Sequence, residues 1–595
     1  MMKTINKIKV YGVVALLGAS SMVSAQEDAT NYMNREMTLE REYDPSVQDA
    51  NKVNTLPVIK EPEVRKIPID YASFALPTDP MKEIHLLSSG NILTDISYNK
   101  KRGYLSLAGG TYMNLNGDAG YHILNSDKDQ LNIFFSHRST HGKLQYLQNE
   151  EKIKAKLNDN LGGLNFRHHF EKASFKLGAH YGYSTFNYYG LPLDISIPTA
   201  TGIINPKADR ETKQVNQTIH FYTGIASRTE DAPIGYLFDL AYTNFSYKYG
   251  FNEKQDGPTE HSLNGKFDIN IPVLTDQRVG LSGNINYFNY NQPAELIVGD
   301  VVYATSFENY MEATLSPYYK MDGGSWHVHL GVNAMFFTGD NKKFMASPNV
   351  FADVEVADKT VLYAQATGKL QSNSLYEVSR INRYINPNTG YVPSRNWLDS
   401  KVGLKSGVAP GFWFDVFGGY KIISDDYLFI SGMSYLDNDF GGQMAAAGDM
   451  DSKLLFAGVQ FKYNYQQLFD MHLKAVYNHW TTELDSDWDE SYKEYEISSL
   501  GRPRFEFNAG LTIRPIHKLS LALDYNLATD RYALYGGNQF KLKNINELNL
   551  TASYTVNDTF GAYVKLNNLL FQKYELYYGY PMQEFNVMAG ININF

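Results

Sequence analysis

Two histidines in the segment WHVHL could share a metal ion. His327 and His329 stand two residues apart, so an extended strand would carry both imidazoles on one face. Trp326, Val328 and Leu330 would then occupy the other face. Imidazole nitrogens at such spacing can bind a divalent metal. The simpler interpretation is that both are polar residues of a strand face, and we predict no metal site and no cofactor.

The run DSDWDE at residues 485–490 imitates the beginning of a calcium-binding loop. Its acidic residues fall on the first, third, fifth and twelfth ligand positions, as Asp485, Asp487, Asp489 and Glu496. However, Glu490 stands where such a loop needs glycine, and Lys493 stands where a neutral ligand is expected. Loose cation binding remains an alternative, but a solvated acidic loop is the better interpretation.

Arginine and aromatic residues are concentrated between residues 371 and 397. This composition is enriched at recognition surfaces, where a planar cation and flat rings make many contacts. The residues concerned are Tyr376, Arg380, Arg383, Tyr384, Tyr391, Arg395 and Trp397. We predict a loop that recognises a ligand or partner, with ordinary loop packing as the alternative.

The sequence lacks the short motifs of common enzyme classes. It contains no G-x-x-x-x-G-K-[ST], no H-E-x-x-H, no G-x-S-x-G and no G-x-G-x-x-G. It also contains no cysteine, which excludes disulfides and thiolate metal sites. We therefore predict that the protein is not an enzyme.

The first 25 residues have the pattern of a secretory signal peptide. Three lysines precede an apolar stretch that runs from Val10 to about Leu17, and Val23-Ser24-Ala25 forms a small-residue cleavage site. The apolar stretch is too short to span a bilayer as a helix. Loss of the three lysines changes the formal charge from −10 to −13. A chain this acidic is a poor nucleic-acid binder, and we predict no nucleic-acid partner.

Residues 26–102 differ in composition from the rest of the chain. Five prolines stand between Leu56 and Pro80 among charges of both signs. Such a segment buries too little apolar surface to fold alone, and proline keeps it extended. We predict a periplasmic proline-rich leader, which alternatively docks in the lumen or mouth of the domain that follows.

From about residue 103 onward, polar and apolar residues alternate with a period of two. In the closing segment FNVMAGININF, Phe585, Val587, Ala589, Ile591, Ile593 and Phe595 form one apolar face. This alternation indicates strands with two different faces, and the 45 tyrosines and 33 phenylalanines also favour strands and lipid–water interfaces. Eleven tilted residues suffice to span a bilayer as a strand.

The connections between these strands alternate between short and long. Tight turns such as 515–518 and 557–560 alternate with long segments such as 371–397 and 481–502. Outer-membrane barrels have short periplasmic turns and longer extracellular loops. Counting by this rule predicts 22 strands, with 20 or 24 as alternatives. The fold class is therefore all-β, a transmembrane antiparallel barrel over residues 103–595 behind an extended proline-rich N-terminal segment.

The C-terminal region resembles the barrel of TonB-dependent receptors. The resemblance lies in NNLLFQKYE at 567–575, GYP at 579–581 and the final aromatic residue. It implies a role in solute passage across the outer membrane. These receptors carry a globular plug before the barrel, whereas the 77 residues at 26–102 are proline-rich. The composition also resembles outer-membrane proteins of Bacteroidota.

These observations predict a location in the outer membrane of a Gram-negative cell, reached by Sec export. Phe595 is expected to be the last lipid-facing residue and also a signal read by the outer-membrane assembly machinery. The expected partners are outer-membrane lipid and that machinery, with a periplasmic or surface protein as a further candidate. The alternative to solute passage is a non-transporting scaffold or accessory subunit of an assembly or secretion complex.

Overall fold

The computed structural model describes residues 101–595 with several gaps. The gaps are 192–196, 200–201, 205–212, 229–232, 251–255, 292–295, 299–300, 304–306, 340–342, 389, 391, 432–443, 467, 485–496, 498–499 and 536–537. The predicted signal peptide and all but the last two residues of the predicted leader lie outside the described residues. The acidic run of residues 485–490 and Tyr391 lie outside them as well.

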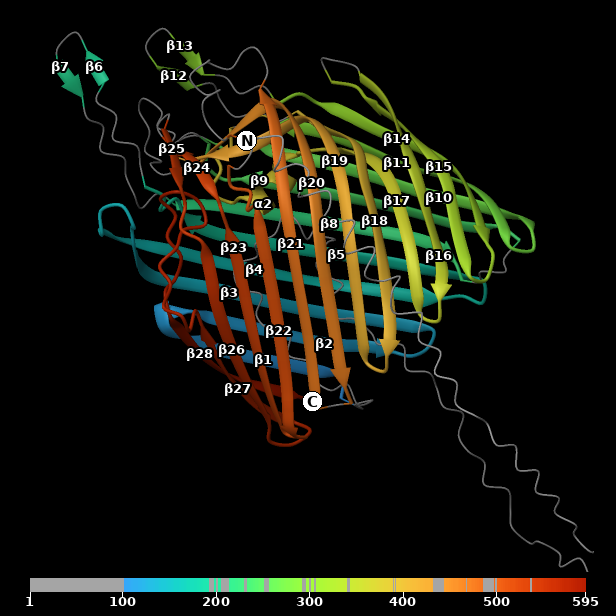
Figure 1. The fold of residues 1–595 in the computed structure, drawn as a ribbon. Coiled ribbons are helices and arrows are strands. Elements are labelled where there is room, and N and C mark those ends of the chain that lie inside the picture. Colours follow the sequence, from blue (N-terminus) through green and yellow to red (C-terminus); the bar gives the residue numbers. More distant parts are fainter. Residues whose placement is uncertain are drawn as a thin grey trace, which may run out of the picture. The chain divides into compact units, whose positions relative to one another are not determined.

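Twenty-two antiparallel strands form one closed sheet (Figure 1). They are β1 (Gly103–Gly110), β2 (Leu115–Asn125), β3 (Asp129–Gln145), β4 (Lys152–His169), β5 (Ala173–Asn187), β8 (Lys213–Ser227), β9 (Gly235–Tyr247), β10 (Thr259–Leu274), β11 (Gln277–Asn291), β14 (Tyr310–Asp322), β15 (Trp326–Phe337), β16 (Lys343–Ala357), β17 (Thr360–Gln371), β18 (Ser394–Ala409), β19 (Phe412–Ile430), β20 (Ala445–Tyr465), β21 (Phe469–Leu484), β22 (Phe505–Ile516), β23 (Leu519–Thr529), β26 (Ile545–Thr555), β27 (Phe560–Asn567) and β28 (Asn586–Asn594). The predicted strand number of 22 is confirmed.

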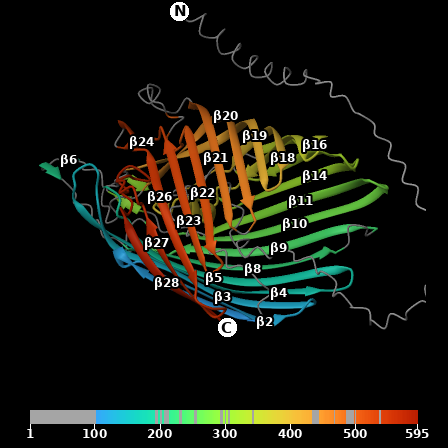
Figure 2. The same cartoon turned by 60° about the horizontal axis from the view of Figure 1, so that its bottom comes forward.

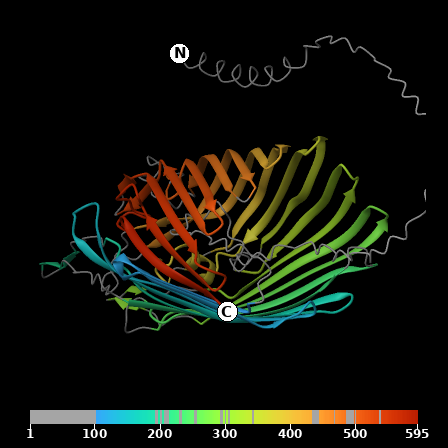
Figure 3. The same cartoon turned by 90° about the horizontal axis from the view of Figure 1, so that it is seen from below.

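The ring closes where the first strand pairs with the last. β1 pairs with β2 on one edge and with β28 on the other, so neither strand leaves an open edge. The backbone of the final residue completes this seam, because the N–H of Phe595 donates to the oxygen of Gly103 at 2.9 Å and the N–H of Gly103 donates to the oxygen of Phe595 at 2.8 Å. Figures 2 and 3 show the blue first strands beside the red last strands.

The predicted two-faced character of the strands is visible at the seam. Leu105 lies opposite Ile593 and Leu107 lies opposite Ile591, so these apolar residues share one face. Leu107 and Ile591 are about half exposed, as expected of the outward face of a barrel. The intervening residues point inward, and there the amide of Asn567 donates to that of Asn586 at 2.7 Å.

Long and short connections lie at opposite ends of the strands. The long connections contain the hairpins β6–β7 (Ile197–Thr199, Gly202–Ile204), β12–β13 (Leu296–Val298, Val301–Tyr303) and β24–β25 (Tyr532–Tyr535, Asn538–Lys541), and the helix α2 (Leu375–Ile381). The helix η2 (Thr111–Met113) lies in the short link between β1 and β2. Two tight turns place glycines at positive φ, Gly324 at 76° and Gly411 at 75°. Glycine has no Cβ to clash in this conformation, so such turns can be short.

Two strand boundaries differ clearly from those we expected. The sequence pattern predicts strand starts near residues 157 and 453, whereas β4 begins at Lys152 and β20 begins at Ala445. Both additions lie at the long-connection end. Residues 445–452 of β20 are mostly small and do not alternate, so only their pairing with β19 reveals a strand. Residues 152–156 of β4, KIKAK, do alternate, with Ile153 and Ala155 buried, and their pairing with β3 shows that they belong to the strand. No helix within the described part of the chain is long and apolar enough to cross a membrane.

The two faces of β28 can be distinguished by a pair of neighbouring substitutions. Ile591→Arg places a charge on the outward face and should destabilise the folded barrel by about 1–4 kcal/mol, depending on depth. Asn592→Arg, one residue later, points inward and should be tolerated. The folded fraction is measured by heat-modifiable gel mobility. Equal effects of both substitutions would contradict the register of this strand.

Candidate functional site

The connection between β17 and β18 folds into the barrel instead of projecting away from it. It comprises residues 372–393 and contains the helix α2 (Figure 1). Its apolar side chains Leu375, Val378 and Ile385 are at most 2% exposed. An isolated seven-residue helix is not stable in water, so these buried contacts must hold it in place. We refer to residues 372–393 as the inner loop.

Local sequence signals begin and end α2. The side chain of Ser374 caps the helix by accepting a hydrogen bond from the N–H of Glu377 at 3.3 Å. Glu377 lies in the first turn and Arg380 in the last, which suits the helix dipole at both ends. Asn382 ends the helix with extended backbone angles. The chain can therefore turn toward the opposite wall immediately after the helix.

Two buried glutamates of the barrel wall hold the beginning of the inner loop. Glu312 on β14 accepts a hydrogen bond from the hydroxyl of Ser372 at 2.7 Å. Glu260 on β10 accepts one from the N–H of Tyr376 at 3.2 Å. Both glutamates are at most 3% exposed. A buried carboxyl group is costly without hydrogen bonds, so the loop and these two side chains stabilise each other.

An ion pair joins the inner loop to the far wall of the barrel. The two terminal guanidinium nitrogens of Arg383 donate to the carboxylate of Asp159 on β4, at 3.1 and 3.0 Å. Going around the ring from β4 to β17 passes through β5, β8, β9, β10, β11, β14, β15 and β16, so β17 is the ninth strand after β4 in a ring of 22. The greatest separation in such a ring is eleven strands. The inner loop therefore spans nearly the full width of the lumen.

Aromatic residues pack around the tip of the inner loop. The ring of Tyr384 stacks on Tyr580 with centroids 4.4 Å apart and meets Tyr189 edge-on at 5.3 Å. The backbone around Tyr384 also pairs with Met444, whose N–H donates to the oxygen of Tyr384 at 2.9 Å. Tyr580 belongs to residues 568–585, which join β27 to β28 and contain the sequences on which the receptor resemblance rests. Two connections far apart in sequence thus meet inside the barrel.

A buried arginine fastens the 568–585 connection. Arg531 is 1% exposed and donates to the backbone oxygens of Glu575 at 2.7 Å and Leu576 at 2.9 Å. Burial lowers the pKa of Arg531 to about 10, so its guanidinium is still charged at neutral pH. The Glu575 side chain accepts hydrogen bonds from Gln148 and from the N–H of Gly579. These contacts fix residues 568–585 in place, so that they can support the inner loop.

The structure divides the predicted recognition residues into two groups. Tyr376, Arg380, Arg383 and Tyr384 lie together in the inner loop, where Arg380 stacks on Tyr376 at 5.8 Å. Arg395 and Trp397 lie on β18 instead. There Arg395 contacts Asp425 at 2.6 Å and Trp397 donates to Ser424 at 3.2 Å. Contact of these residues with a ligand or partner stays a prediction.

Sequence reasoning missed the wall residues that hold the inner loop. Asp159, Glu260 and Glu312 occupy inward positions of strands, where polar residues are expected in any barrel. Nothing in their local sequence distinguishes an anchoring carboxylate from one that simply lines the lumen. Arg531 lies just after the end of β23, and its local sequence does not indicate that it is buried or that it holds a connection.

The two histidines of WHVHL point into the lumen but bind different partners. Nδ1 of His327 contacts the carboxylate of Asp353 at 2.8 Å, and His329 stacks on Tyr318 at 4.9 Å. Across the described part of the chain, no cluster of histidine and acidic residues is arranged to hold a metal ion.

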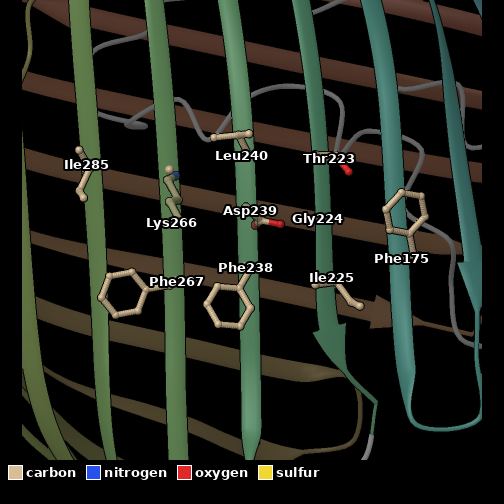
Figure 4. A pocket seen from close by; sticks show the side chains of 11 residues that line it. Phe175, Thr223, Gly224, Ile225, Phe238, Asp239, Leu240, Lys266, Phe267 and Ile285 are labelled. Atoms are coloured by element: carbon tan, nitrogen blue, oxygen red, sulfur yellow. The ribbon is translucent and has the colours of Figure 1, made fainter.

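A hollow on the outward side of the wall is a separate feature (Figure 4). Phe238, Leu240, Phe267 and Ile285 surround Gly265, and no atom lies within 4 Å of the position that a Cβ on this glycine would take. These four side chains are apolar, and three of them are 44–49% exposed. The hollow therefore suits lipid chains rather than a polar solute.

Comparison with solved structures relates this fold to outer-membrane receptors. The ferripyoverdine receptor of the outer membrane of Pseudomonas aeruginosa aligns with a TM-score of 0.57 and 11% identity, over 83% of this chain and 72% of that one. A ferric enterobactin receptor of the same organism aligns with a TM-score of 0.60 and 10% identity, over 83% and 81%. The ferric-catecholate import receptor Fiu of E. coli K12 aligns with a TM-score of 0.59 and 10% identity, over 84% and 82%.

At such low identity, the likeness is one of fold. These neighbours are described as receptors, one of them for import, and not as enzymes. No protein-family model matches the sequence. No curated protein matches it either. The chain forms a closed 22-strand antiparallel β-barrel with the fold of these receptors, and an inner loop crosses its lumen.

The strength of the contact across the lumen can be measured with a double-mutant cycle. Arg383→Met and Asp159→Asn each remove one charge of the pair. Both side chains are about a third exposed (33% and 32%), so solvent screening should limit the coupling energy to about 1–2 kcal/mol. Unfolding free energies in urea provide the measurement, with Arg380→Met as a control of the same type. Fully additive losses would mean that the ion pair does not hold the loop.

Proposed function

We propose that this protein admits a solute across the outer membrane and that the inner loop is the barrier which controls its passage. The observation that carries the proposal is the contact of Arg383 with Asp159, which takes the loop across the lumen. The receptor fold, and the presence of an import receptor among the structures that share it, support the same class of function. The resemblance of residues 567–595 to the end of a TonB-dependent receptor barrel agrees with it.

The way in which the inner loop is held supports a barrier that can move. Its side chains and backbone are held by hydrogen bonds to the wall, among them those to Glu260 and Glu312, and its contact with β4 is a partly exposed ion pair. The side-chain amides of Asn386 and Asn388 are buried, and three of their four polar atoms have no hydrogen-bond partner among the described residues. An unsatisfied buried polar group costs about 1–3 kcal/mol. These unsatisfied groups therefore offset part of the free energy that the inner loop gains from burying its apolar side chains.

A second candidate function is that of a non-transporting scaffold or accessory subunit. A wide barrel must be filled to prevent leakage, and a barrel filled by its own loops needs no transported ligand to account for its lumen. The packing of Tyr384 against Tyr580 and Tyr189 favours this alternative. Conductance after removal of the loop distinguishes the two candidates.

We further propose that the long connections face the outside and the tight turns face the periplasm. In this arrangement the signal peptide directs Sec export, and Phe595 is read by the assembly machinery. Residues 26–102, which lie outside the described residues except for the last two, are proposed to dock at the periplasmic mouth in place of a globular plug. A periplasmic or surface protein remains a possible partner.

Removal of the inner loop should open the barrel. Replacing residues 373–392 with a short Gly-Ser linker takes away every contact that crosses the lumen from β17 and β18. We expect a stable, enlarged single-channel conductance in planar bilayers, whereas Arg380→Ala should leave the conductance at the wild-type level. A loop-free barrel that folds but does not conduct would overturn the transport proposal and favour the scaffold.

The proposed docking of residues 26–102 at the periplasmic mouth can be tested in the loop-free variant. Deletion of residues 27–88, with the signal peptide retained, should raise the conductance of the loop-free barrel further if the leader narrows the periplasmic mouth. An unchanged conductance would exclude that role for the leader and point to a partner protein.

The proposed orientation can be tested by labelling of single cysteines on intact cells, because the chain has no native cysteine. Glu150→Cys lies in the exposed β3–β4 connection at the long-connection end and should react with an impermeant maleimide. Asp558→Cys, in a tight turn, should react only after the cells are opened. Asn386 is unsuitable as a probe because it is 1% exposed. The reverse pattern would invert the orientation.

A further inference from the structure

Five lysines gather on the inward face of four neighbouring strands. They are Lys401 and Lys405 on β18, Lys421 on β19, Lys462 on β20 and Lys474 on β21. In register, Lys405 lies opposite Asp415, which lies opposite Gln460, and Gln460 lies opposite Lys474. The outward face of β20 is identified by Leu455, which is 56% exposed, so the even-numbered residues of that strand face the lumen. We refer to these five residues as the lysine wall.

The lysine wall carries more positive charge than its carboxylates can neutralise. Asp425 and Asp426 on β19 pair with Arg395 and Arg502. Three further aspartates lie close to these lysines on the same inward face. Asp399 pairs with Lys421 at 2.8 Å and Asp415 with Lys401 at 3.8 Å, while Asp470 pairs with Arg514 of β22. Lys405, Lys462 and Lys474 make no ion pair within 4 Å among the described residues. The excess is unusual in a chain whose formal net charge is −10.

One further carboxylate lies beside this sector. Glu506 on β22 accepts a hydrogen bond from the side chain of Asn478 at 2.9 Å and is influenced by the charge of Lys474. Even with Glu506 assigned to Lys474, Lys405 and Lys462 remain as two exposed positive groups. The lysines of the wall therefore do more than balance the acidic groups of the barrel.

Aromatic rings lie beneath the ammonium groups. Nζ of Lys401 lies 3.9 Å from the ring centre of Phe417, Nζ of Lys405 lies 4.4 Å from that of Tyr363, and Nζ of Lys462 lies 5.4 Å from that of Trp413. Such contacts restrict the flexible lysine side chains and attract the cation to the ring face. The ammonium groups are thus positioned in advance, which lowers the entropy cost of binding an anion.

We propose that the lysine wall binds solutes that carry at least two carboxylate or phosphate groups next to an apolar portion. The ammonium groups would donate charge-assisted hydrogen bonds to the anionic oxygens of the solute. The aromatic rings between them would contact its apolar portion. This assignment rests on the proposed function, because it places the anion on the path that opens when the inner loop leaves.

The test measures binding of inorganic tripolyphosphate to the full-length protein in detergent by calorimetry at low salt. The wild type should bind it, and binding should weaken as salt is added because the contact is ionic. The variant Lys405→Gln/Lys462→Gln/Lys474→Gln should bind at least about tenfold more weakly, since it loses several charge-assisted contacts. The matched control Lys143→Gln/Lys152→Gln/Lys172→Gln removes the same charge from exposed lysines outside this sector and should bind like the wild type.

The inference is wrong if the wild type does not bind tripolyphosphate, or if both triple variants lose affinity for it equally. Heat-modifiable mobility establishes that each variant is folded, and Lys462→Gln alone serves if the triple variant is not. The loop-free barrel separates this inference from the proposed function. Conductance without anion binding would reject only the lysine wall, and anion binding without conductance would reject only the transport proposal.

Discussion

The pairing of β1 with β28 is the contact on which the remaining structure depends. A strand at the edge of a sheet leaves a row of backbone N–H and C=O groups without partners, and a lipid bilayer supplies none. Closing the sheet removes that cost at once for every strand. The closure uses the last residue of the described chain, since both backbone groups of Phe595 bond to Gly103. The number of strands, and with it the width of the lumen, follows from this closure.

A ring of 22 strands encloses more space than the side chains of its wall can fill. The protein fills one end of this space with its own backbone, by way of the inner loop and residues 568–585. Backbone inside a barrel needs hydrogen-bond partners, and the surroundings provide them through Glu260, Tyr310 and the backbone of Met444, which directly precedes β20. The hydrogen bonds that hold the inner loop are therefore needed because irregular backbone lies inside the lumen.

The inner surface is not uniform in charge or in packing. Near the inner loop, buried tyrosines and carboxyl groups exclude water, whereas the wall formed by β18–β21 presents lysines above aromatic rings. Both features use the same inward positions of alternating strands. Under the proposed function, a solute that passed the inner loop would meet the lysine wall.

The sequence by itself determined the wall of this protein. Period-two alternation is a local property, and apolar residues such as Ile591 and Ile593 must face away from water whatever their neighbours are, so the strands, their faces and their number of 22 could be predicted. The destination of the connections could not. Arg383 meets Asp159 and Tyr384 meets Tyr580 only after the ring has closed, because these residues come from strands and connections hundreds of positions apart. The composition of residues 371–397 indicated a contact-rich loop, but only the tertiary structure decided that its contacts are with the inside of its own barrel.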